Sequence, residues 1–289
     1  MPNSPEASEY FGQEALPSVQ AVAAIVQSAC EIVRELLRSP IDGWHKGDES
    51  PVTTIDLAVD RFLFAHLRPL LPGAGWLSEE TADNDERLQF RYLWVVDPID
   101  GTRSLIAGRP EFCVSVGLVE TGVGPLLGVI ANPSTAEIYL ASRGEGAFDG
   151  NGTRLQCRQA EHPLAPNVLV SRSDLAKGLW REILPASCMT AMGSLAYKMA
   201  LVAAGAFDGH ATPTPRSEWD AAAGALILAE AGGIATDLHG QPLLFNQISP
   251  IYDGMVVGSR ASHGHMLQLA KQSAELYEIA LARWLAGTL

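Results

Sequence analysis

"VVDPIDGTRSL", residues 95–105, carries an apolar strand straight into two aspartates and then into a glycine and a threonine. Unpaired carboxylates beside a core are costly to desolvate, and Arg103 comes only after both aspartates. We expect Asp97 and Asp100 at the strand end to hold a divalent cation, while the amides that open the next helix hold a phosphate. Oxygen donors without His or Cys favour Mg²⁺ over zinc. The alternative is structural, with Asp97 capping a turn and Asp100 capping the helix.

Composition narrows the class of protein. Of the 289 residues, 47% are hydrophobic. The net charge of -13 argues against nucleic acids and anionic membranes as partners. A small phosphorylated substrate stays compatible, because a bound cation inverts the local field. The four cysteines lack CxxC spacing and are expected to be free thiols. With no signal peptide and no apolar stretch of about 20 residues, we expect a cytoplasmic protein without a membrane span.

Apolar periodicity and turn residues divide the chain into two halves. Up to residue 150, helices are expected first and antiparallel strands after them, with Asn151-Gly152 as a hairpin signal. After residue 150, strands alternate with helices. We therefore expect an α+β half over 1–150, with most metal ligands, and an α/β half over 151–289, with Asp220 and the substrate specificity. The expected helices are 18–38, 53–70, 194–210, 218–233 and 263–286, and the expected strands are 75–80, 92–97, 112–120, 125–133, 137–144, 167–174 and 253–260.

Four further acidic residues stand near the ends of predicted elements. Glu79 and Glu80 end a short strand, whereas Asp56 and Asp220 lie in the first turns of helices. An acid in a first turn also stabilises the helix dipole, so Asp56 and Asp220 are each explained as caps when taken alone.

Taken together, "WLSEET" (76–81), "WVVDPIDGTRSL" (94–105) and "EWDAAAGALILAEAGG" (218–233) resemble the inositol monophosphatase family of Mg²⁺-dependent phosphomonoesterases. The resemblance rests on two signatures in order, Asp-Pro-Ile-Asp-Gly-Thr and Trp-Asp-x-Ala-Ala-Gly. It implies a five-layer αβαβα sandwich, with an antiparallel first sheet, a mixed second sheet and the site between the halves. It also implies sensitivity to lithium and a homodimer.

The resemblance further implies a site with two or three Mg²⁺ ions. One ion would bind Glu79, Asp97 and the Ile99 carbonyl, and a second would bind Asp97, Asp100 and Asp220. A third, weaker ion would be reached by Asp56, and Glu80 would lie behind the ligands. The catalytic residues would be Glu79 and Thr102, which orient and deprotonate the attacking water, together with Asp56. The phosphate would lie against Asp100, Gly101 and Thr102.

Three other stretches concern the substrate. "HKGDESPVTTID" (45–56), "VSRSD" (170–174) and "GSLAYKMALVAAG" (193–205) resemble the 3′(2′),5′-bisphosphate nucleotidases, which convert adenosine 3′,5′-bisphosphate to AMP. A second phosphate calls for added cations. The candidate substrate contacts are Arg172, Gly193, Ser194, Lys198 and Arg216.

Alternative substrates and an alternative class stay open. Inositol-1-monophosphatase is the second candidate activity, because Glu218 differs from the residues that inositol-specific members usually carry before the tryptophan. Histidinol-phosphatase comes third, on "DGTRSLIAGRPEF" (100–112). A binding module without activity should have lost part of the set Glu79, Asp97, Asp100, Thr102 and Asp220, all of which are present.

Overall fold

The computed structural model describes residues 15–45, 47, 51–159 and 166–285, with side chains described up to residue 279. Part of the stretch 45–56, namely residues 46 and 48–50, lies outside the described residues, as does residue 286 of the last expected helix. No helix within the described ranges is long and apolar enough to span a bilayer. All four cysteines are buried free thiols, as predicted.

The first sheet has six strands in the order β3-β4-β5-β6-β7-β8. Its long central strands pair antiparallel, as the hairpin spacing predicted, whereas the edge strand β3 runs parallel to β4. All nine residues of β4 are buried, because helices cover both of its faces. The strands are β3 (Gly75–Ser78), β4 (Tyr92–Asp100), β5 (Cys113–Glu120), β6 (Gly124–Ala131), β7 (Ile138–Ser142) and β8 (Gly146–Asp149).

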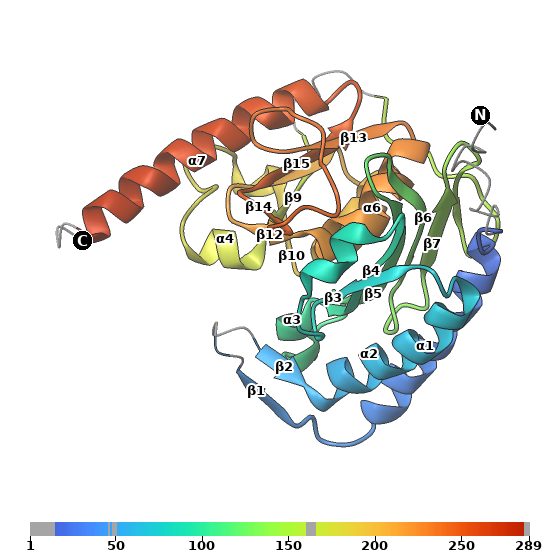
Figure 1. The fold of residues 1–289 in the computed structure, drawn as a ribbon. Coiled ribbons are helices and arrows are strands. Elements are labelled where there is room, and N and C mark those ends of the chain that lie inside the picture. Colours follow the sequence, from blue (N-terminus) through green and yellow to red (C-terminus); the bar gives the residue numbers. More distant parts are fainter. Residues whose placement is uncertain (1–14, 46, 48–50, 160–165, 286–289) are drawn as a thin grey trace, which may run out of the picture.

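Two N-terminal helices, α1 (Val19–Leu36) and α2 (Thr54–Leu67), cover the outer face of this sheet (Figure 1). The hydroxyl of Ser18 caps α1, and Thr53 caps α2 in a capping box with Asp56. Both helices begin within one residue of the predicted position. Their apolar faces form one buried cluster with the outer side chains of β4, β5 and β6.

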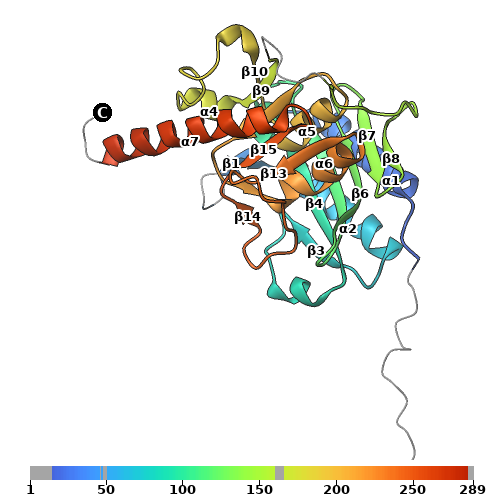
Figure 2. The ribbon, with the colours of Figure 1, turned by 90° about the horizontal axis from the view of Figure 1, so that it is seen from above.

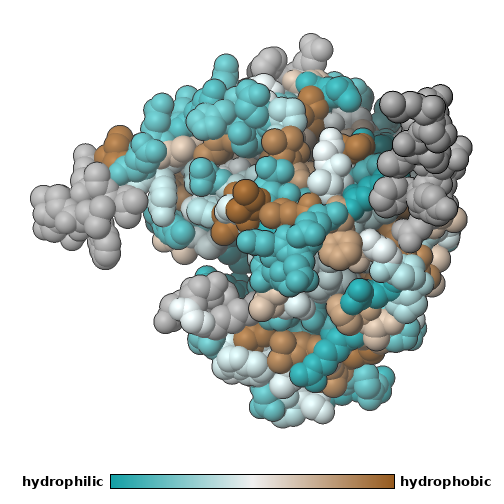
Figure 3. Space-filling model, viewed as in Figure 1, coloured by the Kyte–Doolittle hydropathy of each residue, from teal (hydrophilic) through white to brown (hydrophobic). Residues whose placement is uncertain are grey.

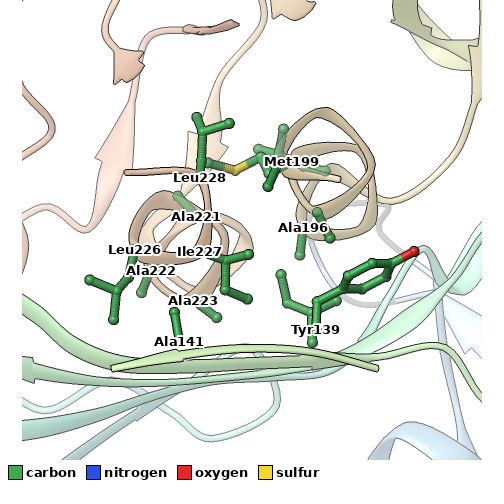
Figure 4. Packing of buried hydrophobic residues seen from close by; sticks show 14 of the residues in the cluster. Tyr139, Ala141, Ala196, Met199, Ala221, Ala222, Ala223, Leu226, Ile227 and Leu228 are labelled. Carbon is green, nitrogen blue, oxygen red and sulfur yellow. The ribbon is translucent and has the colours of Figure 1, made fainter. Parts of the chain in front are cut away.

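Two further helices, α5 (Leu195–Ala203) and α6 (Glu218–Glu230), form the middle layer. Figure 4 shows Ala222 and Ala223 of α6 on the side of the helix that faces the first sheet. A Cβ at Gly128 would lie 2.6 Å from the Ala223 carbonyl oxygen, and one at Gly117 would lie 3.1 Å from the Ala222 Cβ. Small residues on both sides therefore let α6 approach the sheet closely, which brings its first turn to the end of β4.

The second sheet is mixed, in the order β10-β9-β11-β15-β13. Helices α4 (Arg172–Ala176) and α7 (His263–Leu285) cover its outer face, and α7 runs past the body of the molecule (Figure 2). The five expected layers are therefore present. The strands are β9 (Val168–Ser171), β10 (Met189–Met192), β11 (Gly209–Thr212), β13 (Gly233–Thr236) and β15 (Met255–Ser259).

Short elements complete the chain. A two-stranded ribbon precedes α2, the short helix α3 follows β4, and a second ribbon joins the chain ahead of α6 to the loop before β15. Asn151-Gly152 forms a tight turn after β8, but a single bridge between Phe148 and Arg154 replaces the expected hairpin partner. These elements are β1 (Gly43–His45), β2 (Pro51–Thr53), α3 (Thr102–Ile106), β12 (Arg216–Ser217), β14 (Ile251–Tyr252) and the 3₁₀ turns η1 (Arg68–Leu70), η2 (Asp85–Gln89) and η3 (Ala186–Cys188).

Candidate active site

A cavity of about 740 Å³ lies where the end of β4, the first turns of α3, α4, α5 and α6, and β2 come together. Figure 3 shows the molecule hollowed between the part with α4 and the part with β1 and β2. The cavity, which we call the main cavity, contains every sequence-predicted site residue except Asp56 in its lining. Those residues are Glu79, Asp97, Ile99, Asp100, Gly101, Thr102, Arg172, Gly193, Ser194, Lys198, Arg216 and Asp220.

The end of β4 is built to turn two carboxylates inwards. The β4–β5 register shifts between Asp97 and Asp100, so the strand breaks its pairing where the acids stand. One oxygen of Asp97 accepts the Ile99 amide at 3.0 Å, while its other oxygen, Oδ2, is buried and has no hydrogen-bond partner among the residues that the structure describes. Gly101 then takes a φ of 103°, and a Cβ there would lie 2.8 Å from the Glu111 carbonyl oxygen. Glycine is therefore required at the turn into α3.

Three carboxylates converge although they come from distant parts of the chain. One oxygen each of Asp97, Asp100 and Asp220 lies within 4.8 Å of the others. Burial raises the pKa of all three, to about 6 for Asp100, and the neighbouring carboxylates raise those of Asp97 and Asp100 further. Buried carboxylates this close repel one another unless a cation joins them. The unpartnered Asp97 oxygen and the all-oxygen donor set fit a hard divalent metal ion.

Asp100 is held in place by the first turn of α5. The Ser194 hydroxyl donates to Asp100 Oδ2 at 2.7 Å, and the Ala196 amide donates to the same oxygen at 2.6 Å. Ser194 adopts a φ of 53°, which is strained for a residue with a side chain. Gly193 precedes it, where a Cβ would overlap the Ser104 hydroxyl. The predicted substrate residues Gly193 and Ser194 thus also fix a carboxylate of the acid cluster.

Asp220 serves two purposes at once. It is the third residue of α6, and its Oδ2 accepts the Ser217 amide at 3.0 Å in a capping box. The capping interpretation of the sequence is therefore correct for this oxygen. The same carboxylate lines the main cavity beside Asp97. A helix cap is thereby also a member of the acid cluster.

Asp56 lies behind the cavity wall. Its Oδ2 accepts the Thr53 amide at 2.9 Å, and its Oδ1 accepts the Thr102 hydroxyl at 2.9 Å. Burial raises its pKa, and these hydrogen bonds oppose the rise. Since Thr102 lines the cavity, Asp56 reaches the site through that hydroxyl in this structure. A direct contact of Asp56 with an ion stays a prediction.

Glu79 stands on a turn that α2 braces. The buried Asp60 carboxylate accepts the Ser78 hydroxyl at 2.5 Å and the Thr81 hydroxyl at 3.1 Å, one on each side of the Glu79-Glu80 pair. The Glu79 amide donates to the Val96 carbonyl at 3.2 Å, which ties the turn to β4 next to Asp97. The sequence analysis missed Asp60, because nothing local distinguishes it from other polar residues of α2.

The opposite side of the main cavity is cationic. Lys198 is 2% exposed, and among the described residues its ammonium donates a hydrogen bond to the Ser171 hydroxyl at 3.1 Å. Arg216 reaches the same hydroxyl at 3.4 Å. Burial and the Arg216 charge lower the pKa of Lys198 to about 8, against an opposing effect of nearby aspartates. Arg172 differs, since Glu111 holds its guanidinium through two contacts.

Several lining cations escaped the sequence analysis. Six lining residues are Lys or Arg in a chain that has 20 in all and a net charge of -13. Arg103, Arg109 and Lys177 have no shared spacing, so only the fold reveals that they surround one cavity. The cavity is therefore acidic at one end and basic at the other, an arrangement suited to metal cations beside a strongly anionic ligand.

Comparison with known proteins agrees with this arrangement. The sequence model of the inositol monophosphatase family matches residues 15–275. A 3′(2′),5′-bisphosphate nucleotidase CysQ of Aggregatibacter actinomycetemcomitans is 35% identical, over 79% of this chain and 87% of its own length. An inositol-1-monophosphatase of Mesorhizobium japonicum is 36% identical, over 70% and 77%. A solved IMPase of Thermotoga maritima superposes with a TM-score of 0.75 at 26% identity, covering 88% of this chain and 96% of the other.

Proposed function

Because the chain belongs to the inositol monophosphatase family and is thus a phosphoric monoester hydrolase, we propose that it removes one phosphate from a 3′(2′),5′-bisphosphate nucleotide with the help of Mg²⁺. The family is metal-dependent and acts on small phosphorylated substrates. The observation that carries the choice of substrate is the buried Lys198 ammonium facing the main cavity.

The acidic end of the main cavity is the proposed metal site. Glu79, Asp97 and the Ile99 carbonyl would hold one Mg²⁺, and Asp97, Asp100 and Asp220 would hold a second. The orphaned Asp97 oxygen and the raised pKa values of the cluster support this assignment. When bound, such cations neutralise phosphate oxygens and make a coordinated water more acidic. The protein's contribution is to keep the carboxylates buried and fixed, Asp100 by α5 and Asp220 by α6.

The residues around Thr102 would position the attacking water. The Thr102 hydroxyl donates to Asp56, so its lone pairs are left to accept a hydrogen bond from a water in the cavity and to orient that water. Glu79, braced by Asp60 through the neighbouring hydroxyls, is the proposed acceptor of the one proton that the water loses on attack, and the leaving oxygen would take up a proton as its bond to phosphorus breaks. Gly101 and Thr102 would receive the phosphate at the turn into α3. Water would then attack phosphorus in line with the leaving oxygen.

The cationic end is the proposed site of the second phosphate. Lys198 carries three N–H donors in a buried position, and the described residues give it one hydroxyl acceptor, Ser171. A buried ammonium without a carboxylate partner is costly unless an anion joins it. Arg216 converges on the same hydroxyl, so a phosphate here would meet two cations and one hydroxyl.

Phosphate release from a panel of esters tests this function. Adenosine 3′,5′-bisphosphate, inositol 1-phosphate and histidinol phosphate are compared at equal Mg²⁺ and again in EDTA. We expect the highest kcat/KM for the bisphosphate and no release in EDTA. Release that persists in EDTA would contradict metal dependence. A preference for inositol 1-phosphate would contradict the choice of substrate while leaving the phosphatase activity in place.

One pair of variants tests the second-phosphate site separately. Lys198→Asn should raise KM for the bisphosphate at least about tenfold more than KM for adenosine 3′-monophosphate, since a charge-assisted contact contributes about 1.5–3 kcal/mol. The matched control is Lys271→Asn, at an exposed position of α7. Equal losses on both substrates would remove Lys198 as a specificity residue.

A further inference from the structure

A second hollow of about 430 Å³ lies between the β1–β2 ribbon and α3. Its wall is largely apolar and includes Ile41, Trp44 and Ile106. Trp44 and Ile106 are each 47% exposed, although both side chains are large and apolar. We call this hollow the Trp44 slot.

The Trp44 slot continues the main cavity. Pro51 of β2 and Arg103 of α3 line both hollows, so no other element separates them there. Arg103 directly follows Thr102, the residue proposed to receive the phosphate that is removed. A ligand whose phosphate lies at Thr102 can therefore extend along α3 into the slot.

The local structure keeps the slot open. Trp44 pairs with Val52 across the ribbon, which fixes its backbone, and Gly43 lies next to it. A Cβ at Gly43 would lie 3.3 Å from the Val52 carbonyl oxygen and 3.9 Å from Ile106 Cδ1. The absence of a side chain at Gly43 thus leaves the Ile106 side chain, which is 47% exposed, uncovered at the edge of the slot.

Apart from Arg103 and His45, the residues that line the Trp44 slot are uncharged, in contrast to those of the main cavity. The main cavity is lined by acids and cations, which suit metal ions and phosphates. The slot offers an aromatic face and aliphatic side chains, which suit a flat, uncharged ring. Its volume lies within the roughly 300–1,000 Å³ of small-molecule sites.

We propose that the Trp44 slot binds the planar heterocyclic base of a nucleotide whose phosphates lie in the main cavity. This inference rests on the proposed function, and it names the part of the substrate that neither the acidic nor the cationic end can recognise. The base stacks on Trp44 and is packed from the other side by Ile106. Stacking of this kind accepts any base, so selectivity for the sugar phosphates stays with the main cavity.

Kinetics on two substrates test the Trp44 slot. Adenosine 3′,5′-bisphosphate is compared with the abasic analogue, in which the base is absent and the sugar bisphosphate is kept. Trp44→Ala should raise KM for the nucleotide about 5- to 100-fold, the range of base–aromatic stacking, and leave KM for the abasic analogue unchanged. Trp44→Phe should restore most of the affinity.

The matched control is Phe64→Ala, an aromatic residue of similar exposure on α2 that lines neither hollow. An unchanged KM for the nucleotide in Trp44→Ala would overturn the inference.

A binding measurement separates failure of the slot from failure of the proposed function. Tryptophan fluorescence is followed while adenosine 3′,5′-bisphosphate is added to the inactive protein in EDTA. We expect quenching that is present in the wild type and lost in Trp44→Phe. Equal quenching in both proteins overturns the slot, whatever the activity. Quenching at Trp44 without phosphate release from any ester instead supports the slot and refutes the proposed function.

Discussion

Replacing Asp100 by asparagine should stabilise the metal-free protein, although it removes a residue of the proposed metal site. Burial, followed by the Asp220 charge, raises the pKa of Asp100 from 3.8 to about 6. A shift of about 2 units corresponds to about 3 kcal/mol of unfavourable free energy for the ionised group, at about 1.36 kcal/mol per unit. Asparagine removes this charge, and its Oδ1 can still accept from Ser194 and Ala196.

The pH dependence gives the sign of the effect. Below about pH 4 the Asp100 carboxyl is protonated in both the folded and the unfolded wild type, so Asp100→Asn changes little. Between about pH 4 and pH 6 the carboxyl ionises in the unfolded wild type while it stays protonated in the folded one, so the stability of the wild type falls relative to the variant. Above about pH 7 the full difference of about 3 kcal/mol is present, which corresponds to about 5 °C or more in Tm.

Thermal unfolding followed by circular dichroism, in EDTA from pH 4 to pH 8, measures this difference. Mg²⁺ should then raise the Tm of the wild type and leave that of Asp100→Asn nearly unchanged, because the ligand set is broken. Asp149→Asn is the control of opposite sign, since hydrogen bonds from Thr153 and Asn151 lower the pKa of Asp149 and its loss should destabilise. If Asp100→Asn instead lowers Tm in EDTA at pH 7.5, the ionised carboxylate stabilises the fold as a cap. That result would refute the view that the three buried carboxylates destabilise each other in the absence of a cation.

Three further predictions follow from other parts of the structure. The pKa of Lys198 is lowered to about 8, so its charge is present below that pH and lost above it. The ratio of kcat/KM for the bisphosphate to kcat/KM for adenosine 3′-monophosphate should therefore fall above pH 8. A ratio that is flat from pH 7 to 9 would contradict this. Asp60→Ala should leave the hydroxyls of Ser78 and Thr81 without their acceptor and lower the free energy of unfolding by about 1–3 kcal/mol. In thermal melts, the variant should also need a higher Mg²⁺ concentration for half-maximal stabilisation. An unchanged Mg²⁺ dependence would mean that Asp60 supports the fold and not the metal site. Gly128→Ala should destabilise the protein by about 1–3 kcal/mol in urea unfolding, since its Cβ would lie 2.6 Å from a backbone oxygen of α6. The control is Gly264→Ala, which should not destabilise the protein because a Cβ there would have no described atom within 4 Å.

The aspartate pair illustrates what the sequence could predict. Two acids at the end of an apolar strand indicated a cation before any fold was considered, and the structure leaves an oxygen of Asp97 without a partner. The order of helices and strands along the chain followed from periodicity, and the five-layer arrangement followed from the resemblance to the family. In both cases the information lies within a few neighbouring residues, where desolvation and hydrogen bonding act locally.

Other parts of the site depend on tertiary contacts that no spacing encodes. The ion pair between Glu111 and Arg172 joins residues 61 positions apart, and the Asp60 brace depends on how α2 packs beside β3. The Asp56 carboxylate accepts hydrogen bonds from Thr53 and Thr102, and the contact with Thr102, 46 positions away, is not encoded by any local spacing. Such orientations follow from packing, which a linear pattern does not record.

The most direct test is a crystal grown or soaked with Mn²⁺ as an anomalous substitute for Mg²⁺. The account predicts strong anomalous peaks in the main cavity, within coordination distance of Asp97, Asp100 and Asp220, that disappear in Asp97→Asn. Bare carboxylates in the presence of excess ion would contradict it.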